Sequence, residues 1–535
     1  MNQNQSVAYF CMEYGLHESL TIFSGGLGVL AGDLLKAAHD TNYGLVGIGI
    51  LWDEGYTRQR IDPDGKPFDE YPKTPRERMR CLDVRISVTV EDREIELCAY
   101  EVSGLGNAPL FLLEPTNERD RWITRRLYAG GSRERIAAEI VLGVGGVRLL
   151  RALNIEVGDY HFNEGHALFA GFELMREELA GGMEFESAMR SVRQRVVFTT
   201  HTPVKAGNEV HDLELLLQMG VGLGVFSRED LCRIGGSPFE MTVAALRVSR
   251  LANAVAALHG ETARQMWQEV QGAAPILSIT NGVHMGTWQD NRIRESGAGE
   301  SNLENLWTIK QELKSELIEE IVNRTGHVLS SSTLLVGFAR RAATYKRATL
   351  VLRDLKWLEP HLRAGRIQLV FSGKAHPDDL EGKLVLEEIV EIAGRYPGKI
   401  VFLEYYDMDL GRKLTRGCDV WLNTPVRPME ASGTSGMKAA ANGGLNVSVL
   451  DGWWDEGCED GVNGWQFGDA CEGEDADLRD LEGLERVFDE KVIPTFYNER
   501  ERWISMMGRA ISCAQTHFSA RRMLQDYRTR MYSRP

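Results

Sequence analysis

The sequence predicts an α/β protein with two Rossmann-like domains, each built on a parallel sheet. The chain has 535 residues, whereas single hydrophobic cores rarely grow beyond about 250–300 residues. In both halves, short apolar runs alternate with segments of helical spacing, which favours parallel sheets covered by helices. Polar residues and glycines follow the apolar runs at the sheet edge where such folds bind ligands.

A glycine turn lies near the start of the predicted first domain. Strands are expected at residues 7–12 and 45–51, with a helix at 29–40 between them. The turn Ser24-Gly-Gly-Leu-Gly28 precedes the helix, and glycines there let a ligand approach the backbone. Because the turn is not G-x-G-x-x-G, it carries no nicotinamide fingerprint.

Three later apolar strands end in polar residues, within 159–166, 196–203 and 275–284. Because such ends meet at one sheet edge, we expect their polar residues to line one cleft. These residues are Asn163, Glu164, His166, His201, Asn281 and His284. The alternative is that they cap helices and turns.

No metal site is expected from the local spacing of histidines and carboxylates. His161, Glu164 and His166 fit neither H-E-x-x-H nor H-x-x-E-H.

The second half repeats the strand and helix alternation. Its strands are expected at 334–339, 367–371, 400–404 and 420–422, and its helices at 348–362, 380–396 and 410–416. Where the first of these strands ends, Arg340-Arg-Ala-Ala-Thr-Tyr-Lys-Arg347 places four cations within eight residues. Clustered arginine and lysine at a strand end suit phosphate, and the alternative is a solvated run of charge.

The stretch Arg427–Leu445 combines several features of a phosphate site. A small-residue loop, 431–436, is followed by a predicted helix at 437–442, which carries Lys438, and by a strand at 445–450. Backbone N–H groups at such a helix start favour an anion. The stretch therefore predicts a site for a phosphorylated ligand that an amine can attack; the alternative is an ordinary loop with a solvated lysine.

Composition excludes several classes of partner. With 61 basic and 77 acidic residues the net charge is −16, which argues against a broad surface for nucleic acid or anionic membrane. The eight cysteines form no C-x-x-C pair, and neither a secretory signal nor a bilayer-spanning run is visible. These features predict a cytoplasmic protein with reduced thiols.

Three segments are predicted from these patterns. Residues 1–300 are expected to form a first Rossmann-like domain, 301–490 a second one, and 491–535 C-terminal helices.

Nine motifs occur in an order that resembles the α-glucan (glycogen, starch, maltodextrin) phosphorylase family in its short bacterial-type form. They are Gly25–Gly28, His161–His166, His201–Pro203, Ile279–Val283, Arg341 with Tyr345–Arg347, Ser372–Ala375, Val401–Tyr406, Glu430–Lys438, and Phe518–Arg522 with Tyr527. The resemblance implies the GT-B fold, in which the active site lies in the cleft between two Rossmann-like domains. It assigns glucan and phosphate to residues 1–300 and the cofactor to residues 301–490, and it implies that the helices of 491–535 cross back to the first domain.

The same resemblance implies an activity and a cofactor. The reaction is retaining phosphorolysis: a terminal α-1,4-linked glucose of a glucan or maltodextrin reacts with inorganic phosphate to give glucose 1-phosphate. Pyridoxal 5′-phosphate forms a Schiff base with Lys438, and its phosphate exchanges a proton with the substrate phosphate. Paired protein carboxylates, which ordinary glycosidases use, are then not required.

The resemblance also assigns roles to residues of this chain. The catalytic set is Lys438, Arg341, Lys346 and His201. The cofactor-binding set is Lys438, Thr434, Ser435, Arg340, Gly26 and Tyr406. The substrate-binding set is Gly25, Gly28, Glu164, His166, Asn281, Glu430, Ser432 and Gly433.

Several positions depart from the family pattern. The usual G-T-G-N-M-K is Gly433-Thr-Ser-Gly-Met-Lys438 here, Ala343 and Thr344 replace a histidine and a glutamate, and Arg340 replaces a lysine. We also expect no N-terminal regulatory arm of the kind found in the animal enzymes. These departures leave regulation, dimer formation and the preferred glucan open.

Two other functions are alternatives to phosphorolysis. A GT-B glycosyltransferase that uses a sugar nucleotide, such as a glycogen synthase, carries a lysine before the glycine pair, where this chain has Ser24. A glucan-binding protein without turnover would not need Arg341, Lys346 and Lys438 together, because binding a glucan requires no phosphate cluster.

Overall fold

The computed structural model describes residues 6–204, 207–296, 303–468 and 475–533. The chain divides into two compact units, each of which is discontinuous in sequence. The first unit consists of Met1–Tyr56, Tyr71–Thr280 and Met523–Pro535, and the second of Thr57–Glu70 and Asn281–Arg522. Both units are α/β with largely parallel sheets, as the sequence predicts.

The first unit contains a sheet of nine strands among the described residues, in the order β13-β12-β9-β8-β1-β2-β7-β6-β5. The strands are β1 (Ser6–Phe10), β2 (Leu45–Ile50), β5 (Met79–Val90), β6 (Arg93–Val102), β7 (Leu110–Pro115), β8 (Val157–Asn163), β9 (Val196–Thr199), β12 (Leu251–Ala254) and β13 (Ile276–Ser278). Neighbours from β13 to β7 pair in parallel, while β7, β6 and β5 pair antiparallel. β10 (Val210–His211) and β11 (Phe239–Glu240) form a separate small ladder.

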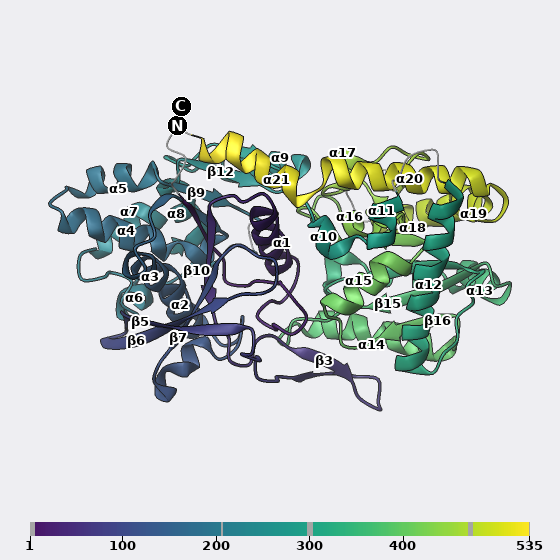
Figure 1. The fold of residues 1–535 in the computed structure, drawn as a ribbon, viewed down its shortest axis with the longest axis horizontal. Helices are drawn as coiled ribbons and strands as arrows, with labels where there is room; N and C mark the ends of the chain where they lie inside the picture. The colour runs from purple at the N-terminus through teal and green to yellow at the C-terminus, as the bar shows by residue number, and fades with distance from the viewer. Residues whose placement is uncertain (1–5, 205–206, 297–302, 469–474, 534–535) are drawn as a thin grey trace. The chain divides into compact units, whose positions relative to one another are not determined.

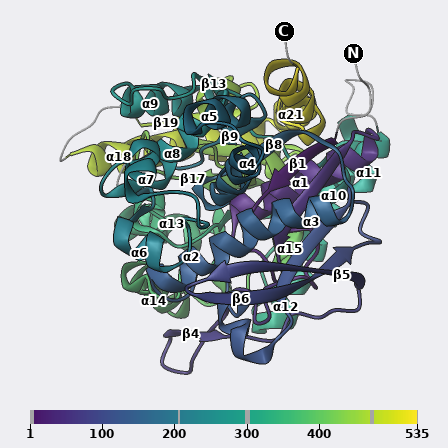
Figure 2. The ribbon, with the colours of Figure 1, turned by 90° about the vertical axis from the view of Figure 1, so that its left-hand side faces the viewer.

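Helices cover both faces of this sheet. On strand β2, a Cβ added at Gly47 would meet Leu35 of α1, whereas Ile48 points the other way and lies next to Gly146 of α3. Figures 1 and 2 show α1 and the group α2–α4 on opposite sides of the strands. The helices are α1 (Gly26–Asp40), α2 (Ser132–Ile140), α3 (Gly146–Ala152), α4 (Phe169–Ala180), α5 (Phe185–Arg193), α6 (Leu213–Gln218), α7 (Arg228–Gly235), α8 (Met241–Val248) and α9 (Ala257–Trp267).

The end of the chain packs into the first unit. The Tyr532 hydroxyl lies 2.6 Å from His161 Nδ1, and Arg250 donates to the Met531 carbonyl over 2.5 Å. His161 Nε2 lies 2.6 Å from Thr199 Oγ1, and burial lowers the histidine pKa to about 3. His161 is therefore a neutral core residue that holds the C-terminal segment.

The second unit contains six parallel strands among the residues described, in the order β16-β15-β14-β17-β18-β19. They are β14 (Leu334–Ala339), β15 (Ile367–Ser372), β16 (Ile400–Leu403), β17 (Val420–Asn423), β18 (Leu445–Val449) and β19 (Gly464–Phe467). The hairpin of β3 (Arg58–Ile61) and β4 (Pro67–Glu70) also belongs to this unit.

The helices of the second unit surround that sheet. They are α10 (Met285–Trp288), α11 (Asn291–Ser296), α12 (Leu303–Thr325), α13 (Leu355–Arg363), α14 (Leu380–Arg395), α15 (Met408–Gly417), α16 (Thr434–Ala440), α17 (Trp454–Gly457), α18 (Ala476–Val487), α19 (Ile493–Asn498) and α20 (Arg500–His517). Helix α21 (Ala520–Tyr527) begins in the second unit and ends in the first.

The unit boundaries differ from the predicted domain limits. The long segment of the first unit ends at Thr280, twenty residues before the predicted domain limit at residue 300. Residue 300 itself lies outside the described residues. Residues 57–70 join the second unit because their hairpin is tied to it, with Lys383 donating to Asp69 over 2.7 Å. Of the segment 491–535, only residues from Met523 onward belong to the first unit.

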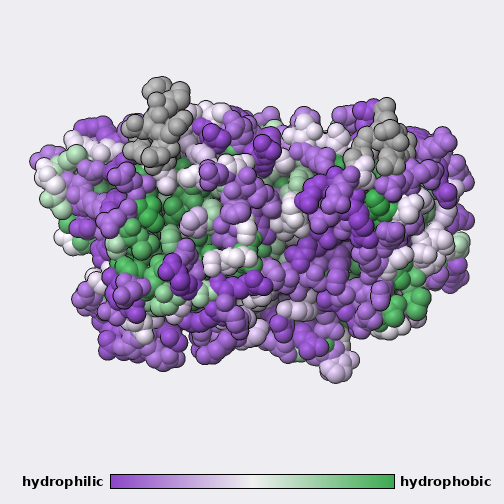
Figure 3. Space-filling model, in the orientation of Figure 1, coloured by the Kyte–Doolittle hydropathy of each residue, from purple (hydrophilic) through white to green (hydrophobic). Residues whose placement is uncertain are grey.

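Most of the face shown in Figure 3 is hydrophilic, and apolar residues appear in separate areas. Exposed apolar side chains include Leu380 and Leu384 of α14. Within the described part of the chain, no helix has the length and apolar character needed to cross a membrane.

A buried ion pair joins α12 to the sheet of the second unit. Lys314 Nζ and Asp419 Oδ2 lie 2.6 Å apart, and their side chains are 0% and 1% exposed. Lys314 also donates to the Thr333 carbonyl, and Asp419 accepts from the Leu335 N–H. Each charge is thus compensated inside the unit.

We expect Asp419→Asn to lower the free energy of unfolding by about 3–5 kcal/mol, because the Lys314 ammonium would stay buried without its counter-charge. Urea unfolding followed by circular dichroism measures the change. Glu391→Gln is the control: Glu391 forms an exposed pair with Arg395 one helical turn away, which contributes about 0.3–0.5 kcal/mol. A loss no larger than that of the control would contradict the prediction.

Candidate active site

Helix α16 carries Lys438 and begins without a side-chain cap. Gly433, the residue before it, has φ 79° in the left-handed region, and no side chain bonds to the first N–H groups of the helix. The helix begins at Thr434, three residues earlier than predicted, so Thr434 and Ser435 lie in its first turn. Lys438 is 7% exposed, and its Nζ lies 3.6 Å from the centre of the Trp288 ring.

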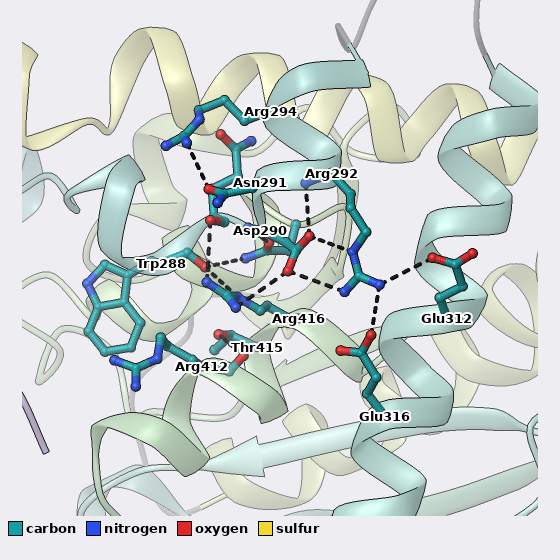
Figure 4. A network of polar contacts seen from close by, with 12 residues as sticks. Trp288, Asp290, Asn291, Arg292, Arg294, Glu312, Glu316, Arg412, Thr415 and Arg416 are labelled. Atoms are coloured by element: carbon teal, nitrogen blue, oxygen red, sulfur yellow. Dashed lines mark hydrogen bonds and ion pairs between the residues drawn. The ribbon is translucent and has the colours of Figure 1, made fainter.

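A polar network fixes the backbone that carries Trp288 (Figure 4). The Trp288 carbonyl accepts from Asn442 Nδ2 over 3.0 Å and from Arg416 Nε over 3.2 Å. Two residues on, Asp290 accepts from Arg292 Nε over 2.9 Å, and its own N–H donates to Asn442 Oδ1. Asn442 lies two residues beyond the end of α16, so the ring and the lysine are held from one short stretch of chain.

Two cations converge on one buried carboxylate. Arg340 and Lys346 each donate to Glu430 Oε2 over 2.6 Å. Burial by itself raises the pKa of Glu430, but the two cations together have the larger effect and lower this pKa to about 2. All three side chains are less than 10% exposed. Arg341, which the resemblance assigns to phosphate together with Lys346, is exposed.

The loop around Glu430 is held through its backbone. The Glu430 N–H donates to Asp451 Oδ2 over 2.9 Å, and the Gly452 N–H donates to Asp451 Oδ1 over 2.8 Å. Burial, together with the nearby Glu430 charge, raises the pKa of Asp451 to about 7. The Ser432 carbonyl accepts from the Trp453 N–H over 2.9 Å. These bonds fix the positions of Glu430 and Ser432.

Two predicted substrate residues in the second unit have buried polar atoms without a hydrogen bond. They are Ser432 Oγ and Asn281 Oδ1, in residues that are 3% and 4% exposed. Buried polar atoms are normally paired, so such atoms are typical of positions that a ligand satisfies. Arg522 donates to the Asn281 carbonyl over 3.0 Å, which holds its backbone.

Two further predicted cofactor residues lie in the second unit. Trp421 Nε1 donates to Ser435 Oγ over 3.2 Å. Burial and Asp407 raise the pKa of Tyr406 to about 12, although Arg340 opposes the shift. Tyr406 therefore remains a neutral phenol at physiological pH.

In the first unit, a buried carboxylate holds the predicted glycine turn. Glu13 Oε2 accepts from the Ser24 N–H over 2.6 Å and from the Gly25 N–H over 3.3 Å, and Oε1 accepts from the Tyr128 hydroxyl. A Cβ added at Gly28 would lie 2.6 Å from Glu13 Oε2, whereas one at Gly25 or Gly26 would meet nothing within 4 Å. Gly28 is thus required for packing, and Gly25 and Gly26 leave their side open.

A second buried carboxylate arranges the strand-end residues of the first unit. Glu164 has φ 72°, and its Oε1 accepts from the His201 N–H over 2.5 Å and from the Thr202 hydroxyl over 3.1 Å. His201 Nε2 lies 2.6 Å from Asn163 Oδ1, and burial lowers the pKa of His201 to about 3. His201 is therefore neutral, and its ring donates to Asn163. His166 lies elsewhere, with Nε2 4.0 Å from Glu209 Oε2.

The structure thus brings together many of the predicted residues within each unit, and it adds three that sequence reasoning missed. Glu13 holds the glycine turn. Trp288 covers Lys438, and Asp451 anchors the backbone of Glu430. The only sequence signal for Glu13 and Asp451 was an acidic residue next to a buried strand. Trp288 lies among polar residues, and nothing in the sequence indicates its contact with Lys438.

Known proteins resemble this chain over almost its whole length. Residues 289–456 match the family of carbohydrate phosphorylases. The maltodextrin phosphorylase of Thermococcus litoralis is 38% identical, covering 99% of this chain and 71% of that protein. The glycogen phosphorylase of Aquifex aeolicus is 35% identical over 99% of this chain and 86% of its own length. An uncharacterized protein of Methanocaldococcus jannaschii is 35% identical over 98% of this chain and 99% of its own length. At this identity and coverage, the chain belongs to the carbohydrate phosphorylase family.

Proposed function

We propose that the chain catalyses retaining phosphorolysis of an α-1,4-glucan, releasing glucose 1-phosphate from the terminal sugar. The observation that carries this proposal is the convergence of Arg340 and Lys346 on Glu430, beside the loop that leads to Lys438. Two buried cations at one point suit a site that must hold phosphate next to a sugar. Relatives named maltodextrin and glycogen phosphorylase support the same reaction.

Pyridoxal 5′-phosphate is the cofactor that the second unit fits best. The uncapped N–H groups at the start of α16, with the Thr434 and Ser435 hydroxyls, offer donors for its phosphate. Lys438, buried beneath Trp288, offers the amine for the Schiff base. When bound, the cofactor would supply a phosphate that exchanges a proton with the substrate phosphate.

The protein's own groups would then hold the sugar and the phosphate. Lys346 and Arg340 can share their charge between Glu430 and an incoming phosphate, which keeps the phosphate oriented in a dry environment. Glu430, Ser432 and Asn281 would bind sugar hydroxyls, and the unpaired Ser432 Oγ and Asn281 Oδ1 support that role. Arg341, which is exposed, would have to turn inward to reach the phosphate.

We further propose the GT-B arrangement, in which the two units correspond to the two Rossmann-like domains and the active site lies between them. Gly25, Gly26 and Gly28, and the pair Glu164 and His201, would then complete the site from the first unit. A cytoplasmic location is supported by the free thiols of the described cysteines. The sugar-nucleotide transferase alternative is not favoured, because the relatives named above are phosphorylases.

Borohydride reduction tests the cofactor directly. We expect peptide mass spectrometry of the reduced protein to find a phosphopyridoxyl group on the peptide that contains Lys438. Lys438→Arg should lose both the label and glucose 1-phosphate release, because arginine forms no Schiff base. Lys356→Arg, an exposed control on α13, should keep both. An active protein without label on Lys438 would overturn the cofactor assignment.

The phosphate role of Lys346 has its own test. We expect Lys346→Met to raise the KM for inorganic phosphate and to lower kcat/KM by about 10²–10³-fold, the loss typical when one charge-stabilising donor is removed. Initial rates of glucose 1-phosphate formation over a phosphate series measure both. Lys491→Met, which removes an exposed lysine paired with Asp460, is the control. Equal rates in the two variants would exclude Lys346 from phosphate binding.

A further inference from the structure

Four ionisable side chains meet in the first unit, whereas Lys438 and its neighbours in sequence belong to the second. Glu139 lies on α2, His166 in the short helix Gly165–Ala167, and Glu209 and His211 at β10. One ligand atom from each of Glu139, His166 and Glu209 lies within 4.8 Å of the others. These segments are far apart in sequence, so the fold itself assembles the group.

The spacing within the group is too wide for direct hydrogen bonds. His211 Nε2 lies 3.4 Å from Glu209 Oε1 and 3.7 Å from Glu139 Oε2, while His166 Nε2 lies 4.0 Å from Glu209 Oε2. N–H···O bonds usually span about 2.7–3.2 Å. Two nitrogen or oxygen ligands of one tetrahedral zinc ion, each about 2.0–2.2 Å from the metal, lie roughly 3.3–3.6 Å apart. The two distances from His211 are close to this ligand spacing, and the 4.0 Å distance from His166 is somewhat longer. The spacing thus leaves room for an ion between the side chains.

Several buried atoms of this group lack hydrogen bonds. Glu139 is 0% exposed, and neither of its carboxylate oxygens has a hydrogen bond. His211 is 3% exposed, and neither ring nitrogen has one. A carboxylate buried without compensation is costly, so such groups are paired, protonated or bound to a metal.

A proton on His211 is the competing explanation. Burial by itself lowers the pKa of His211, but Glu139 and Glu209 together have the larger effect and raise this pKa to about 9. Arg135 Nε also lies 3.2 Å from Glu209 Oε1 and neutralises part of its charge. A single proton on Nε2, however, can at best be shared between two of the surrounding oxygens in a weaker three-centre bond, and it leaves His166 unaccounted for. One divalent ion would bind both carboxylates and one nitrogen of each ring.

We propose that Glu139, His166, Glu209 and His211 bind one divalent first-row transition ion. Imidazole and carboxylate ligands suit zinc and its neighbours, and four protein ligands leave no open position, which is typical of a structural rather than a catalytic site. The ion would join α2, the Gly165–Ala167 turn and β10 within the first unit. No metal is expected from the sequence, because the local spacing around His166 matches no motif and the other three residues are distant along the chain.

Zinc is the probe for the test. The full-length protein is treated with chelator, loaded with Zn²⁺ and desalted, and its metal content is measured by mass spectrometry. We expect about one Zn²⁺ per chain and a Tm that rises on loading, because an ion that binds only the folded state stabilises it. Co²⁺ loading should give the visible absorption of a cobalt ion held by protein nitrogen and oxygen. Neither readout depends on glucan phosphorolysis.

Two ligand variants and one matched control decide the assignment. Glu139→Gln and His211→Ala should each weaken Zn²⁺ binding at least about 10-fold, since even loss of an outer partner of a metal ligand has such an effect. Glu139→Gln keeps the size and shape of the side chain, so it should fold. Glu173→Gln, the control, alters another fully buried carboxylate, which pairs with Arg148 and Arg176 on the same unit, and it should bind Zn²⁺ as the parent does.

Three outcomes would overturn the proposal. The first is that the parent protein retains no Zn²⁺ after desalting. The second is that both ligand variants retain as much as the parent. The third is that Glu173→Gln loses the ion as fully as Glu139→Gln, because binding would then depend on general stability.

Discussion

The sharing of one buried carboxylate by two cations is the interaction on which the second unit's site depends. Arg340 and Lys346 can be buried because Glu430 compensates them, and Glu430 stays ionised because both cations hold its pKa near 2. Such a cluster is costly to bury unless its geometry is fixed. The Asp451 bond to the Glu430 backbone supplies that fixed geometry. A phosphate entering this cluster would find its counter-charges already desolvated, which favours tight orientation.

The same logic distinguishes three kinds of buried charge in this protein. Lys314 and Asp419 are paired within hydrogen-bonding distance and join two elements, so they act as structure. Glu430 carries one negative charge and is paired with two cations, so the cluster has an excess positive charge that an anionic ligand can balance. Glu139 is buried without a hydrogen bond, and His211 lies 3.7 Å from its carboxylate, so a cation could bind between them. The balance of charge around each group, more than its burial, thus indicates what it can bind.

The parallel strands of the second unit were the part of the fold best predicted from the sequence. β14 occupies the predicted residues 334–339, and β15 to β18 lie within two residues of prediction, because strands buried on both faces are continuous apolar runs. β5 was missed because it lies at the sheet edge and alternates charged with apolar residues. The hairpin at 57–70 was missed as part of the second unit because no local pattern reveals a partner three hundred residues away.

Candidate site residues were predictable when they lay in one stretch of chain and not when the fold assembled them. Glu430, Ser432 and Lys438 share a stretch of nine residues, whereas the contact of Trp288 with Lys438 spans 150 positions. His166 shows the difference most clearly. The sequence places it after a strand beside Glu164 and assigns it to the substrate, but its Nε2 faces Glu209. Its Nδ1 is buried without a hydrogen bond, and a histidine that ligates a metal through one nitrogen usually donates from the other. The two roles are therefore compatible: Nε2 can serve the ion while Nδ1 remains available to a ligand of the first unit.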